Sequence, residues 1–479
     1  MYPTDKAPFS QLWQYAGNDT QLEIFSSDAT IESWLASERA LATAQARHGV
    51  ITEDDAAQIN QAAVLSNIDR EKLWEDAKNV GYPILGLVRQ IASHLPEGPN
   101  GRVHYGATTQ DIMDTGLVLQ MTASLNAFDK QIVRLGNALA ARAEEHKDTV
   151  MPGRTHAQQA IPTTFGATLA TFLDQIRRQR ERLEEALERV RVISLFGAGG
   201  NNAAQGEQAA TVRAEMARLL DLKDPVVSWH VERDVLGDFG WVCSTLCGSM
   251  AKFGRNIVDL SRTEIGEVFE PYNSHRGASS TMPQKVNPIS SELMIGISVV
   301  AGALTSTLPR LQESGHERAA GEWQGEWLVI PTLANLAGAA LDEAIVVAEG
   351  MRVDTDRMSS NLAFDGGLIM AEAQMIQLAP ALGREKAHDL VYEASTKARE
   401  EHTTLEEVLP IIAVQHGVED LLPKNFAQPA DYVGEAQAMV NAAVAAWNAQ
   451  LQQPKTLTTR IVQEFTHDEY TDQEPIPRC

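Results

Sequence analysis

Residues 117–139 read LVLQMTASLNAFDKQIVRLGNAL. Large apolar side chains recur in this stretch at steps of three and four residues, which places them along one face of an α-helix. An apolar stripe of this length favours a long helix that packs against other helices. The stripe consists of Leu117, Met121, Leu125, Phe128, Ile132, Leu135 and Leu139.

A second stripe, from Phe165 to Val190, repeats this pattern. Its polar face carries RRQRERLEE (177–185), where acids stand among the bases, so a solvated face with charge pairs is favoured over a nucleic-acid surface. Alternating strand patterns are essentially absent from the chain. We therefore predict an all-α fold. Further helices are predicted over roughly residues 234–270, 289–308, 323–350 and 368–399.

The helical patterns group into three parts. We predict an N-terminal helical domain over residues 1–112, a central long-helix bundle over 113–355 and a C-terminal helical domain over 356–479. Several helices exceed about twenty-five residues, so they expose more apolar surface than one chain can cover. We therefore expect the central bundle to associate with further copies of the chain.

Composition limits the class of partner. The 479 residues carry a formal net charge of −24. Nucleic-acid binding needs clustered Lys and Arg, so that partner is not expected, whereas a small anionic substrate remains compatible with a locally basic site. No basic start with an apolar run and no stretch of about eighteen apolar residues occurs. We therefore expect a cytoplasmic protein without a secretory signal or a membrane span.

The three cysteines are Cys243, Cys247 and Cys479. An odd and sparse set is typical of a reducing compartment rather than of a disulfide framework. Cys243 and Cys247 lie four residues apart, on one helix face, with no His or Cys partner nearby in the sequence. We predict buried apolar thiols and no metal site.

Region 1, HYGATTQDIMDT (104–115), precedes the first long helix. Gly106 and Ala107 permit close backbone approach, and Thr108 and Thr109 offer hydroxyl and N–H donors. This arrangement suits a carboxylate held at a helix N-terminus. The alternative is that Thr-Thr-Gln-Asp is a capping box and nothing more.

Region 2, MPGRTHAQQAIPTT (151–164), places Thr155 and His156 between turn residues and the start of the second long helix. A histidine there could give or take a proton. A structural or solvated histidine is the alternative. The later segment FGAGGNNAAQG (196–206) lacks the third glycine of GxGxxG, because Asn202 stands there, so we predict a close-packed turn in which Asn201 or Asn202 could line a site.

Region 3, GASSTMPQKVNPISSE (277–292), interrupts the helical pattern most sharply. Ser279 and Ser280 lie among small residues, which favours a mobile loop. Lys285 and Asn287 are donors, and Pro288 can start a helix. Hydroxyls, an ammonium and a helix start together indicate an anion site with a candidate nucleophile or base. The absence of a G-x-S-x-G elbow argues against a hydrolase.

These three segments, in this order, resemble the fumarase/aspartase superfamily. Residues 278–292, ASSTMPQKVNPISSE, are similar to its signature loop G-S-S-x-M-P-x-K-x-N, with Ala278 where the family usually has Gly. The resemblance spans nearly the whole chain. It implies a mostly helical homotetramer without a cofactor, in which each active site is assembled from the three regions on three different subunits.

The resemblance also implies roles for single residues. Ser279 matches the catalytic base on the flexible loop, and His156 matches a histidine that binds substrate or serves as the acid. The groups that would hold the dicarboxylate or tricarboxylate substrate are Thr108, Thr109, Thr155, Lys285, Asn287, Ser280 and Met282.

The chemistry that fits these residue types is anti β-elimination. A serine alkoxide removes a proton from the carbon next to a carboxylate and produces an aci-carboxylate dianion, which needs several preorganised donors. The leaving group on the neighbouring carbon then departs. Serine is a weak base at its ordinary pKa, so a loop that closes and excludes water is required.

Other segments bear on the substrate. SWHVERD (228–234), HERAAGEWQGEW (316–327) and GLIMAEA (367–373) look most like the carboxymuconate cycloisomerase branch. Those cycloisomerases usually carry Trp at the position of His156, whereas fumarate-releasing lyases carry His. We therefore predict a lyase that releases fumarate from a substituted succinate, with a C–N bond favoured over C–O, and keep the cycloisomerase as the alternative.

Two further functions are disfavoured. Adenylosuccinate lyases normally place a His-Asp pair where this chain reads KNVGYP (78–83), so that substrate is not expected. A non-catalytic structural protein is the remaining alternative, and the joint presence of Ser279, Lys285, Asn287 and His156 argues against it.

Overall fold

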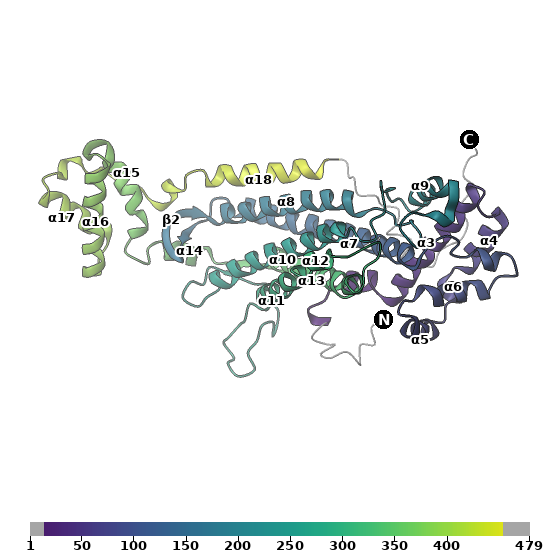
Figure 1. Ribbon diagram of the computed structural model, residues 1–479. Helices are drawn as coiled ribbons and strands as arrows, with labels where there is room; N and C mark the ends of the chain where they lie inside the picture. Colours follow the sequence, from purple (N-terminus) through teal and green to yellow (C-terminus); the bar gives the residue numbers. More distant parts are fainter. Residues whose placement is uncertain (1–13, 454–479) are drawn as a thin grey trace.

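The computed structural model describes residues 14–453, most of which are helical. The molecule is elongated (Figure 1). Short helices of the N-terminal part lie at one end, a small C-terminal helical lobe lies at the other, and long helices run between them. The mostly helical character of the prediction is confirmed.

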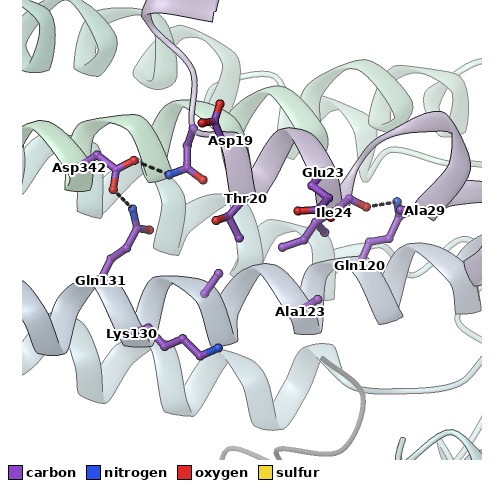
Figure 2. A pocket seen from close by; sticks show the side chains of 12 residues that line it. Asp19, Thr20, Glu23, Ile24, Ala29, Gln120, Ala123, Lys130, Gln131 and Asp342 are labelled. Carbon is purple, nitrogen blue, oxygen red and sulfur yellow. Dashed lines mark hydrogen bonds between the residues drawn. The ribbon is translucent and has the colours of Figure 1, made fainter. Parts of the chain in front are cut away.

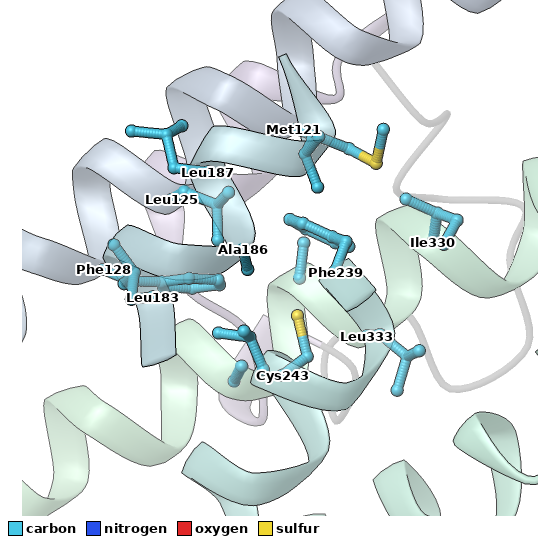
Figure 3. Close-up of a cluster of buried hydrophobic side chains, with 14 of the residues drawn as sticks. Met121, Leu125, Phe128, Leu183, Ala186, Leu187, Phe239, Cys243, Ile330 and Leu333 are labelled. Carbon is cyan, nitrogen blue, oxygen red and sulfur yellow. The ribbon is translucent and has the colours of Figure 1, made fainter. Parts of the chain in front are cut away.

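The long helices form a bundle with a continuous apolar core. Every member of the predicted stripe except Leu117 is fully buried. Figure 3 shows Leu125 and Phe128 among apolar side chains of the neighbouring helices, such as Leu183 and Phe239. The helices of the bundle are α7 (Thr109–Glu145), α8 (Phe165–Val190), α10 (Asp234–Leu260), α11 (Ile289–Thr305), α12 (Leu308–Leu311) and α13 (Glu322–Gly350).

The two internal cysteines lie on α10, and both are buried. Burial raises the pKa of the Cys247 thiol to about 12, which is typical of an unreactive side chain. The prediction of buried apolar thiols is confirmed for Cys243 and Cys247, whereas Cys479 lies outside the described residues.

The N-terminal part packs on the bundle through α3, which contacts α7 and α9. Ser26 caps α3 by accepting the N–H of Ala29 at 3.2 Å. The elements here are α2 (Asp19–Ile24), α3 (Ser27–Arg47), α4 (Glu53–Ala62), η1 (Leu65–Asn67), α5 (Arg70–Val80), α6 (Ile84–Ser93) and η2 (Pro99–Arg102), joined by η3 (Ala203–Gln208) and α9 (Ala209–Leu219).

The C-terminal lobe has a small core of its own. After the lobe the chain turns back, and α18 lies along α8 and α7 of the central bundle (Figure 1). The predicted domain boundaries at residues 112 and 355 stay predictions. The elements are α14 (Thr355–Leu362), η4 (Leu368–Met370), α15 (Ala371–Leu382), α16 (Arg384–Glu401), α17 (Leu405–Gln415), η5 (Glu419–Leu421), η6 (Pro429–Tyr432) and α18 (Ala436–Leu451).

Gly136 on α7 allows α18 to pack closely against α7. A Cβ atom at Gly136 would lie 2.1 Å from the ring of Trp447, which is fully buried. We expect Gly136→Ala to lower the free energy of unfolding by roughly 1–3 kcal/mol through overpacking. Denaturant unfolding measures this loss. Gly248→Ala, where the added Cβ meets nothing within 4 Å, is the control, and equal stability of Gly136→Ala and the wild type would contradict the packing argument.

The prediction of an all-α fold is confirmed only in part, because the mostly helical chain also contains two small two-stranded sheets. β1 (Val150–Thr155) pairs antiparallel with β2 (Gln158–Thr164), and β3 (Val268–Phe269) pairs antiparallel with β4 (Arg352–Val353). The β1–β2 turn has positive φ at both central residues, His156 (50°) and Ala157 (63°). Such turns normally use Asn or Gly, so the sequence carried no hairpin signal.

Two predicted helices were too long. The helix predicted over 234–270 ends at Leu260, because the chain then extends into β3. The helix predicted over 368–399 is broken at Gly383, whose φ of 80° and ψ of 153° are not helical. The predictions over 289–308 and 323–350 match α11 and α13 closely.

The bundle leaves part of its apolar surface uncovered. Two stretches, 289–311 and 322–350, are long and apolar enough to cross a membrane by length and composition alone, which is weak evidence because core helices of soluble proteins pass the same test. The second stretch is 72% buried within the chain, but the first is only 28% buried. Exposed apolar side chains on α10, α11 and α13 include Trp241, Val299, Val300, Leu328 and Val346.

Candidate functional site

Region 1 lies where α7 begins. Thr108 is the N-cap residue with extended backbone, and its N–H donates to Asp111 Oδ2 at 3.0 Å. The capping box is therefore present. The capping box does not rule out a role in anion binding. Thr108 and Thr109 are only half-buried and stand at the N-terminus of a 37-residue helix, where anions are favoured.

Asp111 joins this helix start to the glycine-rich loop 196–206. Its buried carboxylate accepts the backbone N–H groups of Phe196 at 2.8 Å and Gly197 at 2.9 Å, and it lies 2.8 Å from His230 Nε2. Sequence patterns did not predict this role, because no local pattern records a contact between residues 85 positions apart.

The predicted close packing of the loop 196–206 is confirmed only in part, because Phe196 and Gly197 are buried but most of residues 198–206 are exposed. Gly197 has a φ of +70°, and a Cβ atom there would lie 3.3 Å from the carbonyl oxygen of Gly106. Asn202 is buried and its Nδ2 donates to Leu195 O at 3.0 Å, so it is structural, whereas Asn201 is exposed.

Arg318 brings a guanidinium to region 1. Its Nη1 donates to Gln110 Oε1 at 3.3 Å and its Nη2 donates to Ala198 O at 2.9 Å. The residue lies in the segment between α12 and α13 and was not predicted as part of the site. Its place beside the start of α7 adds a positive charge where Thr108 and Thr109 offer donors.

Region 2 forms the tip of the β1–β2 hairpin. Thr155 ends β1, His156 takes the first turn position, and both side chains are exposed. The expected position of His156 at a helix start was wrong, because β2 intervenes before α8 begins at Phe165. The hairpin is held by Arg154, which donates to both carboxylate oxygens of the buried Glu267 at 2.8 and 2.6 Å.

Region 3 forms a loop between β3 and α11 that projects from the bundle (Figure 1). Its base is closed by Asn287 N–H, which donates to Gly277 O at 2.8 Å. Gly277 has a φ of +68°, and a Cβ atom there would lie 2.3 Å from Asn287 O, so the closure requires glycine. Ser280, Met282 and Lys285 are exposed on the loop.

Ser279 has a distinct environment on this loop. Its Oγ accepts the backbone N–H groups of Thr281 at 3.3 Å and Met282 at 3.1 Å. Hydrogen bonds to the charged form of a group favour that form. These two donors would therefore stabilise a serine alkoxide relative to the hydroxyl.

A single chain does not bring the three regions together. Regions 1 and 2 lie at opposite ends of α7, whose 37 residues span about 55 Å at 1.5 Å each. Within residues 14–453, no hydrogen bond joins the predicted site residues of one region to those of another. Ser279, Ser280, Met282, Lys285 and Asn287 share one loop, while Thr108 with Thr109 and Thr155 with His156 form two further groups.

A cavity of about 340 Å³ between α2 and α7 is separate from all three regions (Figure 2). Asp342 lies at its edge and accepts hydrogen bonds from Asn18 Nδ2 and Gln131 Nε2, both at 2.6 Å. No predicted site residue lines this cavity.

Comparison with known proteins identifies the family. A lyase family model matches residues 13–302, and an adenylosuccinate lyase C-terminus model matches residues 367–443. The chain is 40% identical over 432 residues to the 3-carboxy-cis,cis-muconate cycloisomerase of Pseudomonas aeruginosa, a match that covers 89% of this chain and 94% of that protein. The chain belongs to the fumarase/aspartase superfamily. The predicted membership and the prediction of an enzyme are confirmed.

Other members of the superfamily are also similar to this enzyme. The crystal structure of the 3-carboxy-cis,cis-muconate lactonizing enzyme from Pseudomonas putida has a TM-score of 0.84 at 36% identity, covering 91% of this chain and 99% of that one. The N-acetyl-S-(2-succino)cysteine lyase of Dickeya dadantii is 34% identical over 410 residues, 84% of this chain and 89% of that protein.

Proposed function

We propose that this superfamily enzyme is a cycloisomerase that interconverts a 3-carboxymuconate-type tricarboxylate and its lactone. The observation that carries the proposal is the 40% identity to a 3-carboxy-cis,cis-muconate cycloisomerase along 89% of the chain. Arg318 beside region 1, together with Lys285 and Asn287 of region 3, provides groups that would bind the carboxylates of such a substrate.

The reaction uses the predicted elimination chemistry in either direction. In lactone formation, a substrate carboxylate oxygen adds to one carbon of a double bond, and the electron pair moves toward the carboxylate on the neighbouring carbon. Lys285, Asn287 and the helix start at Thr108 would stabilise the resulting aci-carboxylate. The Ser279 hydroxyl then gives its proton to that neighbouring carbon. In the reverse direction, the Ser279 alkoxide takes the proton back and the C–O bond breaks.

A site shared between subunits follows from the length of α7. About 55 Å of helix separates Thr108 from His156 in one chain, far more than a small substrate spans. The uncovered apolar side chains on α10, α11 and α13 offer a surface for other copies to bury. We therefore include in the proposal a homotetramer in which the three regions come from different subunits.

A fumarate-releasing lyase is the second candidate, and His156 favours it. The exposed imidazole at the hairpin tip could protonate a departing heteroatom. The similar enzyme of Dickeya dadantii is named for N-acetyl-S-(2-succino)cysteine. A C–S bond is therefore a third candidate for the bond that this enzyme would break, beside the predicted C–N and C–O bonds.

A two-substrate assay separates the candidates. The purified enzyme is incubated with 3-carboxy-cis,cis-muconate and, separately, with N-acetyl-S-(2-succino)cysteine. Loss of diene absorbance without fumarate supports the cycloisomerase. Fumarate from the thioether supports the lyase and rejects the first proposal. Ser279→Ala enzyme prepared identically shows whether any turnover belongs to the proposed site.

A further inference from the structure

A buried group of three charges lies one helical turn beyond Asp111. The guanidinium of Arg233 faces the carboxylates of Asp114 and Glu326, and the three side chains are 2%, 1% and 1% exposed. Asp114 oxygens accept from Nη1 at 2.7 Å and Nη2 at 3.0 Å. Glu326 oxygens accept from Nε at 2.9 Å and Nη2 at 2.6 Å. Both contacts are therefore bidentate, the geometry that fixes orientation most strictly.

The three residues belong to three different elements. Asp114 is in the second turn of α7, Arg233 is the N-cap residue of α10, and Glu326 is in the second turn of α13. A parallel contact lies beside them, because His230 faces Asp111 as Arg233 faces Asp114. The second pair is displaced from the first by three positions in both segments. The segment 229–233 is thus held along the start of α7 by two buried carboxylates.

This group links region 1 to the segment that carries Arg318. Residues 312–321 lead directly into α13, where Glu326 is held by Arg233. Arg318 in that segment donates to Gln110 Oε1, and Gln110 Nε2 donates in turn to Asp114 Oδ2 at 3.1 Å. Trp323 Nε1 also donates to Asp114, at 3.1 Å. The guanidinium of Arg233 therefore lies between the two segments that flank the proposed carboxylate site.

With both carboxylates ionised, the group carries one negative charge in excess. Burial lowers the pKa of Arg233, but the two carboxylates raise it by more. Arg233 therefore stays charged. Burial raises the pKa of Glu326 to about 7, because it outweighs the hydrogen bonds and charge of Arg233, and the charge of Asp114 adds to the rise. Glu326 is therefore neutral below about pH 7 and ionised above it. In the neutral form one oxygen carries the proton and the other accepts only as a carbonyl oxygen, so the ionic contact with the guanidinium is lost.

We propose that Arg233 is a positioning residue that fixes the 312–321 segment against the substrate-binding end of α7, and that protonation of Glu326 loosens this link. Ionised Glu326 holds Arg233 by both oxygens, so Arg318 is held where substrate binds. Protonated Glu326 holds Arg233 less tightly, and substrate binding weakens as the segment moves. The effect falls on KM, because neither Arg233 nor Glu326 reaches the reacting atoms. The inference rests on the proposed function for its substrate only.

Glu326→Gln tests the proposal, since the amide is neutral at every pH and mimics the protonated state that the wild type adopts below about pH 7. Loss of one charged hydrogen bond predicts a KM for 3-carboxy-cis,cis-muconate roughly tenfold above the wild type at pH 8 and equal to it at pH 6. kcat is expected to change little. Asp129→Asn is the control, because it removes the carboxylate charge from another buried ion pair, between Asp129 of α7 and Arg180. Its KM should equal that of the wild type at both pH values.

A substrate-free measurement separates this inference from the proposed function. Hydrogen exchange of the backbone amides of 312–321 is compared at equal pH between variants. Exchange in Glu326→Gln should be roughly tenfold faster than in the wild type at pH 8 and unchanged at pH 6. Absence of wild-type turnover rejects the proposed function and leaves the exchange result to decide. Equal exchange in Glu326→Gln and the wild type at both pH values overturns the positioning role.

Discussion

Ser279→Ala is expected to lower kcat by a factor of roughly 10²–10⁴, the range that proton transfer by a positioned side chain contributes. The substitution removes one oxygen from a half-buried loop residue and creates no cavity in the core. Folding and oligomer size should therefore be unchanged. Steady-state kinetics on whichever substrate proves active, together with light scattering, measure the two quantities.

The hydrogen bonds at Ser279 favour the charge state that a serine base would need. Two backbone N–H groups, from Thr281 and Met282, donate to Oγ and favour the alkoxide. Closure of the loop over the substrate would exclude water and strengthen these interactions further. The donors belong to the backbone, so they remain in Ser279→Ala and the variant tests the oxygen alone.

Ser274→Ala is the matched control for this prediction. Ser274 is an exposed serine that precedes region 3 in the same connection between β3 and α11. Its loss should leave kcat within a factor of about two, as for an exposed substitution away from special features. Near-normal turnover by Ser279→Ala would remove Ser279 as the base and leave His156 as the remaining candidate for proton transfer.

The helices were predictable because their signal is local. A stripe such as Leu125, Phe128 and Ile132 records burial at the helical period, and the core follows it. The β1–β2 hairpin was not predictable on the same basis. Its strands contain Pro152 and Pro162 and its turn uses His156 and Ala157, so neither alternation nor a turn dipeptide marks it.

Candidate site residues could be proposed from the sequence only where one segment carries their chemistry. Region 3 combines hydroxyls, an ammonium and a helix start within sixteen residues. A motif this short can be recognised in the sequence without knowledge of the fold. The support of region 1 comes from residues far along the chain. Asp111 binds N–H groups 85 and 86 positions away, and Arg318 reaches Gln110 across 208 positions. Such contacts exist only after folding.

Mixing two inactive variants is expected to restore activity. Each variant is first assayed alone, and the mixture is read when both His156→Ala and Ser279→Ala have lost activity. If each site takes Ser279 and His156 from different subunits, random assembly at equal amounts leaves about a quarter of the sites with both groups intact. If both groups come from one subunit, no site is intact. The 37 residues of α7 hold regions 1 and 2 at opposite ends, so a site that uses both Thr108 and His156 must draw them from different subunits.

A second mixture tests the sharing of sites without relying on the recovery of activity. Wild-type subunits mixed equally with the double variant of His156 and Ser279 should retain about a quarter of full activity if sites are shared, but about a half if each subunit holds its own site. Differently tagged subunits, purified in sequence, establish that mixed oligomers have formed. No recovery in such oligomers in the first mixture, together with half activity in the second, would reject sharing of these two residues. The apolar side chains exposed on α10, α11 and α13 would then bring copies together without completing the active site.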